Sequence, residues 1–211
     1  ADDVGGDYYD AFVPAEGEMV FLMGDVSGHS ISAALVVSMA RAAFSGIVDQ
    51  GIKMPHEIFT MMNNLMLGHL RRVKMMTCFG GHIDKSGRLT CCNAGQSFPY
   101  LIREDGRVEQ IKQIGYPLGA SRKKTLKFLE MQLPDRCRIV MFSDGVVEAM
   151  NEENQQFGYD RLERLVKKLG WQKSNEEFFA AVYSEVRKFA GTVPWGDDVT
   201  VALLDYDRSK S

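Results

Sequence analysis

The sequence lacks the features of several common classes of protein. Its 25 Lys and Arg residues are outnumbered by 28 Asp and Glu residues, which gives a formal net charge of −3. A nucleic-acid-binding domain would normally be basic along one face, so no nucleic-acid partner is expected. The most apolar stretch, from Ile31 to Phe44, is interrupted by Ser38 and Arg41 and is too short to span a bilayer. No signal-peptide pattern is visible.

Cysteine is scarce and its spacing is uninformative. The four residues are Cys78, Cys91, Cys92 and Cys137, and none of them forms a C-x-x-C pair. A zinc site or a disulfide framework would need closer or more regular spacing. We therefore interpret all four as reduced core thiols in a cytosolic setting, with the adjacent Cys91 and Cys92 on opposite faces of a strand.

What the 211 residues do contain is the composition of one large globular domain, 45% hydrophobic and 25% charged. Apolar periodicity predicts the following elements in order: a strand at Glu18–Met23, helices at Ser30–Phe44 and Pro55–Leu70, a hairpin at Met75–Ile83 and Arg88–Cys92, a second hairpin at Tyr100–Arg103 and Arg107–Ile111, strands at Thr125–Leu133 and Arg138–Phe142, helices at Tyr159–Leu169 and Asn175–Ala190, and a strand at Asp198–Leu204. Helices inserted between hairpin-linked strands favour an α+β fold with antiparallel sheets over a doubly wound parallel sheet.

Four acidic sites each lie beside a glycine or at the end of a predicted strand: Gly6-Asp7, Gly24-Asp25, Asp144-Gly145 and Gly196-Asp197-Asp198. In an antiparallel pair the end of one strand lies beside the start of its neighbour. Aspartates after the strands ending at Met23 and Phe142 could therefore meet an aspartate before the strand starting at Asp198.

Carboxylates that converge in this way repel one another, and a bound cation relieves the repulsion. Oxygen ligands suit Mg²⁺ or Mn²⁺ better than zinc. The flanking glycines would also let a backbone carbonyl such as that of Val26 face a metal. Each Asp-Gly pair alone would more often be an ordinary turn. Residue pattern alone therefore leaves a metal site and a set of turns as open alternatives.

Five motifs in fixed order carry a specific resemblance. The segments VGGDYYD, GDVSGHSISAAL, NAGQSFPYL, FSDGVVEAMN and GDDVTVALL, between Val4 and Leu204, resemble the SpoIIE/RsbU-type branch of the PPM (type 2C) protein serine/threonine phosphatases. The resemblance implies an αββα sandwich, in which two antiparallel sheets flanked by helices hold two Mn²⁺ or Mg²⁺ ions between them. It implies one PPM-type phosphatase domain over residues 1–211.

The resemblance also implies a role for individual residues. Asp25 matches the aspartate that bridges both metals, and Val26 matches the residue that supplies a backbone carbonyl. Asp7, Asp144 and Asp197 match the remaining ligands, and Asp198 is the weaker candidate of its pair. Asp25 and Asp144 would be catalytic through a metal-activated water that attacks phosphoserine or phosphothreonine in line. No cysteine nucleophile is needed, and Cys137 is followed directly by Arg138, not by a Cys-x5-Arg phosphate loop.

The sequence departs from the family pattern in three places. Gln96 stands where the family usually has a histidine. His29 lies two positions beyond the histidine of the animal enzymes, where Ser27 stands, so both a catalytic and a structural role are open for it. The segment that usually precedes VGGD is missing, and the chain starts at Ala1 without an initiator methionine. We therefore expect a piece of a longer protein.

The function that the resemblance implies is removal of phosphate from a STAS-domain protein of the anti-anti-sigma type in a bacterial partner-switching pathway. An N-terminal sensor or receiver domain and a cytoplasmic location are expected, the latter including the cytoplasmic part of a membrane-bound sensor. The methionine-rich helix after Pro55 leaves core packing and homodimer formation both open. A pseudophosphatase that only binds its partner is the main alternative, and an unrelated phosphohydrolase of small molecules is a third.

Overall fold

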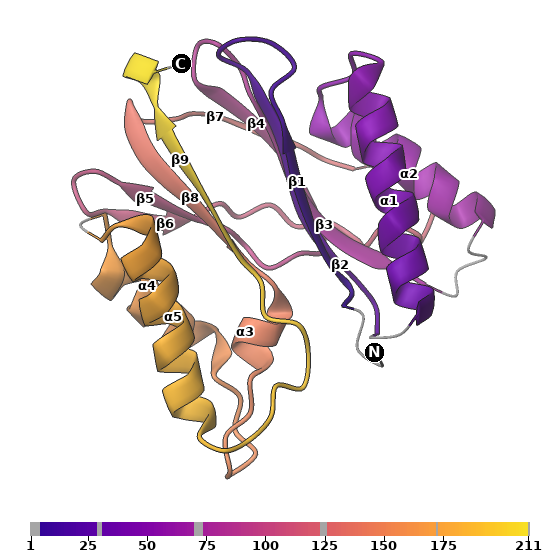
Figure 1. Cartoon of the computed structure of the whole chain (residues 1–211). Helices are drawn as coiled ribbons and strands as arrows, with labels where there is room; N and C mark the ends of the chain where they lie inside the picture. The colour runs from indigo at the N-terminus through magenta and orange to yellow at the C-terminus, as the bar shows by residue number, and fades with distance from the viewer. Residues whose placement is uncertain (1–4, 29–30, 70–73, 123–125, 172, 211) are drawn as a thin grey trace. The chain divides into compact units, whose positions relative to one another are not determined.

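A computed structural model of the chain describes residues 5–28, 31–69, 74–122, 126–171 and 173–210 (Figure 1). The elements form two compact units that alternate along the sequence. The first unit comprises Ala1–Gln96, Gln113–Leu133 and Arg208–Ser211, and the second comprises Ser97–Lys112 and Pro134–Asp207. Each unit contains one antiparallel sheet with its own helices. The predicted α+β class with two antiparallel sheets is confirmed, whereas the assignment of all residues to a single domain stays a prediction.

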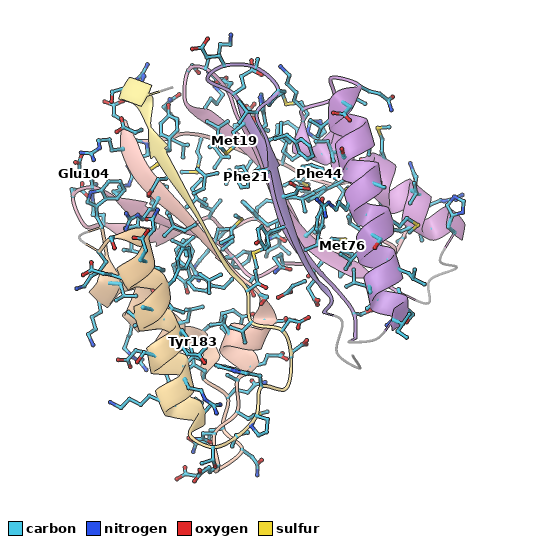
Figure 2. All side chains as sticks on the ribbon, in the orientation of Figure 1. Met19, Phe21, Phe44, Met76, Glu104 and Tyr183 are labelled. Carbon is cyan, nitrogen blue, oxygen red and sulfur yellow. The ribbon has the colours of Figure 1, made fainter. Side chains whose placement is uncertain are left out.

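The first unit is built on a five-stranded sheet in the order β1-β2-β3-β4-β7. Its strands are β1 (Asp7–Phe12), β2 (Met19–Val26), β3 (Met76–Ile83), β4 (Arg88–Ala94) and β7 (Leu129–Gln132). Helices α1 (Ile31–Asp49) and α2 (Pro55–His69) connect β2 to β3. One hydrophobic core joins these helices to one face of the sheet, and it includes Phe44 of α1 and Met76 of β3 (Figure 2).

Helix α2 illustrates how the sequence specifies these elements. Proline suits the first helical turn because it has no N–H to leave unsatisfied, and the helix begins at Pro55. Its buried residues Ile58, Phe59, Met62 and Met66 recur three or four positions apart, which places them on one helical face. Met62, Met66 and Met76 fill the core, as the simpler interpretation of the methionines predicts, whereas Met61 and Met75 are exposed.

The second unit is built on a four-stranded sheet in the order β6-β5-β8-β9. Its elements are β5 (Tyr100–Arg103), β6 (Val108–Gln110), β8 (Arg136–Phe142), α3 (Asp144–Glu148), α4 (Gly158–Leu169), α5 (Asn175–Ala190) and β9 (Val201–Asp207), followed in the first unit by a short 3₁₀ turn at Arg208–Lys210. A capping box fixes the start of α5, since the hydroxyl of Ser174 accepts from the backbone N–H of Glu177 at 3.2 Å and the Glu177 carboxylate accepts from the N–H of Ser174 at 3.0 Å.

Several predicted boundaries were wrong in ways that affect the candidate site. The strand expected at Glu18–Met23 continues to Val26, so Asp25 lies inside β2 and not after it. The last strand begins at Val201 and not at Asp198. Strand β1 and the short helix α3 were not predicted as elements, although their residues were recognised as motifs. The strand expected at Thr125–Leu133 is confined to Leu129–Gln132, and Thr125 lies outside the described residues.

Helix α1 is longer than the apolar stretch seen in the sequence, because it continues to Asp49. Among the described residues it is the one helix long and apolar enough to cross a membrane, so the sequence-based estimate of its length was wrong. A helix buried in a protein core passes the same test. Val36, Ala40 and Phe44 of α1 belong to the core of the first unit, and we therefore assign α1 to that core.

All four cysteines are buried and none forms a disulfide. Burial raises the pKa of Cys91, Cys92 and Cys137 to about 12 and also raises that of Cys78. A thiol with a raised pKa is a poor nucleophile at neutral pH. The interpretation of the cysteines as unreactive core residues is confirmed.

His82 on β3 is a buried titratable residue that belongs to none of the acidic motifs. Its side chain is 5% exposed, and its Nε2 atom lies 3.7 Å from a carboxylate oxygen of Glu18, which also pairs with Lys53. Burial lowers the pKa of His82, the charge of Glu18 opposes this shift, Lys53 reinforces it and Asp84 opposes it. The folded state therefore favours the neutral imidazole.

The pH dependence of stability follows from this shift. Above the unfolded-state pKa of about 6.5 the imidazole is neutral in both states; below it the unfolded chain takes up the proton first, so the free energy of unfolding falls. Urea denaturation between about pH 7.5 and pH 5.5 should show this loss in the wild type and a flatter profile in His82→Gln. His69→Gln, at an exposed position on α2, should keep the wild-type profile. A profile for His82→Gln as steep as that of the wild type would contradict the assignment.

Candidate metal centre

The register between β1 and β2 places two of the predicted ligands opposite each other. Asp7 pairs with Asp25, and Asp25 in turn pairs with Thr77 on β3. Side chains of directly opposed residues in antiparallel strands project from the same face of the sheet. Val20 and Leu22 of β2 lie in the core beneath the helices. Because side chains alternate along a strand, Asp25 projects from the opposite face. A row of polar side chains thus crosses three strands on the face away from α1 and α2.

Gly6 leaves room for two oxygen atoms beside this row. A Cβ atom on Gly6 would lie 2.6 Å from the carbonyl oxygen of Val26 and 2.7 Å from Oδ1 of Asp25. The two oxygens therefore approach the same small volume, which only glycine leaves unfilled. The backbone N–H of Val26 donates to the carbonyl of Gly6 at 3.0 Å and fixes this approach. A carbonyl and a carboxylate oxygen are the donors that Mg²⁺ and Mn²⁺ prefer.

Gln96, which replaces the usual histidine of the family, is bound into the same unit. The hydroxyl of Thr77 donates to Oε1 of Gln96. Asn93 holds the backbone of Gln96 on both sides, because its Oδ1 accepts from the N–H of Gln96 at 2.8 Å and its Nδ2 donates to the carbonyl at 2.9 Å. Gln96 is buried, at 7% exposed. It supports the strand that carries Thr77, beside Asp25, and sequence reasoning missed Thr77 because no motif marks it.

The second unit holds the other predicted aspartates, and Ser143 organises them. Phe142 at the end of β8 pairs with Val201 at the start of β9, so Asp144 at the start of α3 and Asp197 in the loop before β9 lie at the same end of one strand pair. The buried hydroxyl of Ser143 donates to the carbonyl of Asp198 at 3.1 Å and accepts from the N–H of Thr200 at 2.9 Å. Ser143 thereby ties the acidic loop before β9 to the end of β8.

The geometric expectation from sequence was half right. The aspartate after β8 does lie near the acidic loop that precedes β9, as the antiparallel rule predicts. The expectation that Asp25 would meet the same loop by strand pairing was wrong, because β2 pairs with β1 and β3 and not with β9. Asp25 instead meets Asp7, which stands at the start of the unpredicted strand β1.

The acidic side chains of the second unit influence one another electrostatically. Burial raises the pKa of Asp144, the charge of Asp197 raises it further, and the backbone N–H groups of Asp144 and Gly145 partly offset both effects. Glu148 is a third carboxylate in this group, since burial first and then the charges of Asp144 and Asp197 raise its pKa. Sequence reasoning missed Glu148, although its position four residues after Asp144 on α3 puts both on one helical face.

Asp197 and Asp198 differ in their relation to Asp144. Asp197 contributes to the pKa shift of Asp144, whereas Asp198 is not among its causes. Oδ1 of Asp197 also accepts from the N–H of Asp198 at 2.8 Å, which orients the Asp197 carboxylate. These observations favour Asp197 as the member of the pair that acts with Asp144.

The oxygen donors present in each unit are of the kind that a hard divalent cation prefers. Asp7, Asp25 and the Val26 carbonyl lie in the first unit, and Asp144 and Asp197 lie in the second. Within the described ranges, no three His, Cys, Asp or Glu side chains are grouped closely enough to hold an ion. His29 lies outside the described residues. The assignment of these residues as metal ligands stays a prediction.

The space beside Gly6 allows a test of the ligands proposed in the first unit. Gly6→Ala should push the Val26 carbonyl and the Asp25 carboxylate apart, and weaken Mn²⁺ binding by about tenfold to a hundredfold, the range seen when groups that orient ligands are lost. Isothermal titration calorimetry with Mn²⁺ measures this. Gly46→Ala on α1, where an added Cβ meets nothing within 4 Å, is the matched control and should bind as the wild type does. Unchanged binding by Gly6→Ala would refute the role of this volume.

Ser143→Ala tests whether Ser143 anchors the acidic loop before β9. The variant removes the hydroxyl that bonds to the Asp198 carbonyl and to the Thr200 N–H, which should lower the free energy of unfolding by about 1–3 kcal/mol. Urea denaturation measures the change. Ser38→Ala on α1 removes a hydroxyl that bonds only to the carbonyl one turn earlier, so it should have little effect. Equal stability of both variants would show that Ser143 does not anchor the loop.

Comparisons with known proteins identify relatives of this chain. Two curated relatives are Phosphoserine phosphatase RsbU of Bacillus subtilis (strain 168), 27% identical over 207 residues, and Protein IcfG of Synechocystis sp., 24% identical over 189 residues. The matches cover 97% and 77% of this chain, but only 60% and 30% of the relatives. The chain thus spans less than two thirds of the length of either protein.

Solved structures show the same fold. The SiaA-PP2C domain of Pseudomonas aeruginosa matches with a TM-score of 0.85 and 22% identity, covering 96% of this chain and 81% of that domain. The PP2C phosphatase domain of SpoIIE from Bacillus subtilis, solved with a fragment of its regulatory domain, matches with a TM-score of 0.77 and 20% identity, over 97% of this chain and 58% of that one.

A family model described as Stage II sporulation protein E (SpoIIE) matches residues 15–207. The matched range contains Asp25, Asp144 and Asp197 and begins after Asp7. Since it covers most of the chain, and since the neighbouring folds are PP2C phosphatase domains, the resemblance predicted from the motifs is confirmed: the chain belongs to the SpoIIE family.

Proposed function

We propose that this chain hydrolyses phosphoserine and phosphothreonine on a partner protein with the help of two Mn²⁺ or Mg²⁺ ions. The observation that carries the proposal is the approach of the Asp25 carboxylate and the Val26 carbonyl to one small volume beside Gly6. PPM phosphatases depend on such ions, and one structural neighbour, at 13% identity and a TM-score of 0.67, is RsbX in complex with magnesium.

Each proposed ligand has a distinct task. Asp25 would bridge both ions, with the Val26 carbonyl beside it. Asp7, directly opposite Asp25 on β1, would be the remaining ligand from the first unit. Asp144 and Asp197 would be the ligands that the second unit contributes, and Glu148 adds negative charge near them. When bound, the ions supply a water nucleophile at neutral pH and neutralise the phosphoryl oxygens. The chain itself then has to hold the carboxylates ionised and orient the phosphoryl group for in-line attack.

The substrate we propose is a phosphorylated STAS-domain protein in a bacterial partner-switching pathway. The name of RsbU as a phosphoserine phosphatase supports the chemistry. One structural neighbour comprises the RsbU and RsbW domains of Rv1364c from Mycobacterium tuberculosis. It supports the proposal that this domain is part of a longer, multidomain protein. Since the chain spans only part of its curated relatives, we also propose an attached sensor or receiver domain, a cytoplasmic location and, as a further option, a homodimer.

Removal of the bridging aspartate tests the enzyme assignment. Phosphate release from a phosphorylated STAS protein in the presence of Mn²⁺ should fall by on the order of a thousandfold in Asp25→Ala, because charge stabilisation at the phosphoryl group is lost. The thermal unfolding midpoint should change little. Asp198→Asn should retain far more activity than Asp197→Asn, and Glu148→Gln should lose less than Asp144→Asn. Full activity of Asp25→Ala would exclude the bridging role.

The alternatives give different results in the same experiment. A pseudophosphatase would bind Mn²⁺ and the STAS protein but release no phosphate. A phosphohydrolase of small molecules would release phosphate from p-nitrophenyl phosphate but leave the phosphoprotein untouched. No phosphate release together with no Mn²⁺ binding by calorimetry would exclude the metal-dependent enzyme.

A further inference from the structure

A groove lies between helices α4 and α5 on the second unit. Its volume is about 450 Å³, within the range of sites that take small ligands or peptide side chains. It is lined by Phe157, Arg161, Arg164, Leu165, Lys168, Glu185, Lys188 and Phe189, all of which belong to the second unit. The two helices run side by side in Figure 1. No residue of the groove belongs to the acidic motifs of the candidate metal centre.

The walls of the groove are strongly basic for a chain with a net charge of −3. Arg161, Arg164 and Lys168 occupy one stripe of α4, spaced by about one helical turn over a length of about 10 Å. Lys188 faces them from α5, and Glu185 is the single carboxylate in the lining. In the described part of the chain, Arg164, Lys168 and Lys188 form no ion pair or hydrogen bond through their side chains. Their neighbour Lys167, outside the groove, pairs with Glu163.

The floor of the groove is apolar and ordered by its own contacts. The rings of Phe157 and Phe189 meet edge to face with their centroids 5.4 Å apart. The guanidinium of Arg161 lies 4.6 Å above the Phe189 ring and donates to the carbonyls of Gln156 and Phe157, at 3.0 Å each. Arg161 is thereby held in one orientation, as a preformed cation over an aromatic surface.

We infer that this groove binds an acidic peptide segment of a partner protein, with carboxylates against Arg164, Lys168 and Lys188 and one bulky apolar side chain against the partly exposed Phe189. Charge complementarity selects the carboxylates. The partly exposed Phe189 distinguishes such a segment from a bare inorganic anion, which carries no apolar surface to cover it. Glu185 disfavours a uniform polyanion such as nucleic acid. The inference does not depend on the proposed phosphatase activity, because it concerns binding alone.

Binding of a labelled peptide to the intact chain tests the inference. A peptide of about 12 residues, in which glutamates flank a phenylalanine, spans the groove whether helical or extended. Fluorescence anisotropy of its fluorescein conjugate should show saturable binding that weakens as salt is added. Replacement of the glutamates by glutamine, or of the phenylalanine by alanine, should weaken binding in each case, because both parts of the segment are needed.

Charge reversal in the protein locates the site. Arg164→Glu combined with Lys168→Glu should weaken binding at least about tenfold. Lys167→Glu combined with Lys173→Glu is the matched control, since it makes the same change in net charge at exposed positions outside the groove. Circular dichroism and the unfolding midpoint show whether each variant is folded, and Lys188→Glu provides a second, single-site reversal on α5.

Three outcomes would overturn the inference. No binding of any peptide of the panel up to millimolar concentration would do so, as would equal losses in the groove variant and its control. Tighter binding of a single-stranded oligonucleotide or of phosphatidylglycerol vesicles at the same residues would assign the groove to a different class of ligand. Loss of peptide binding with unchanged phosphate release would support the groove while leaving the proposed phosphatase function intact.

Discussion

Antiparallel register is the constraint on which the candidate site depends. In the first unit the register sets Asp7 opposite Asp25. Because side chains alternate along β2, the same register also directs Val20 and Leu22 into the core beneath the helices. A slip of one residue would exchange the two faces of β2 and bury Asp25 beneath α1 and α2. Burial of the apolar residues and placement of the carboxylate are therefore one requirement, met by a single register.

The same coupling explains what could be predicted from sequence. Helices α2 and α5 were predicted closely, because apolar residues recur at helical spacing and a proline marks the start of α2. Motif order selects the four aspartates as candidate ligands, and that assignment stays a prediction. Strand pairing could not be predicted in the same way. Periodicity shows that a segment is a strand, but its neighbour depends on the packing of the whole unit, so the pairing of Asp25 with Asp7 was missed.

Residues without a motif were missed for a related reason. Thr77 lies beside Asp25 only through the β2–β3 register, and Glu148 lies near Asp144 only because a five-residue helix forms after β8. Such a helix is too short to show periodicity. The helix also requires glycine at position 145, where a Cβ atom would lie 2.0 Å from the carbonyl oxygen of Asp198. Only the folded structure reveals this close approach, although the Ser-Asp-Gly sequence makes it possible.

The acidic cluster and the basic groove divide the second unit electrostatically. Burial and mutual repulsion raise the pKa values of Asp144 and Glu148, so in the absence of a cation their ionisation at neutral pH destabilises the fold; this cost disappears as the pH falls below the unfolded-state values. A cation removes the cost, which links metal affinity to the crowding of the carboxylates. The carboxylates of α3 would repel an acidic ligand, whereas the basic side chains of α4 and α5 would attract it. The separation of charge within one unit therefore allows a metal centre and an acidic partner segment to be bound without competing for the same residues.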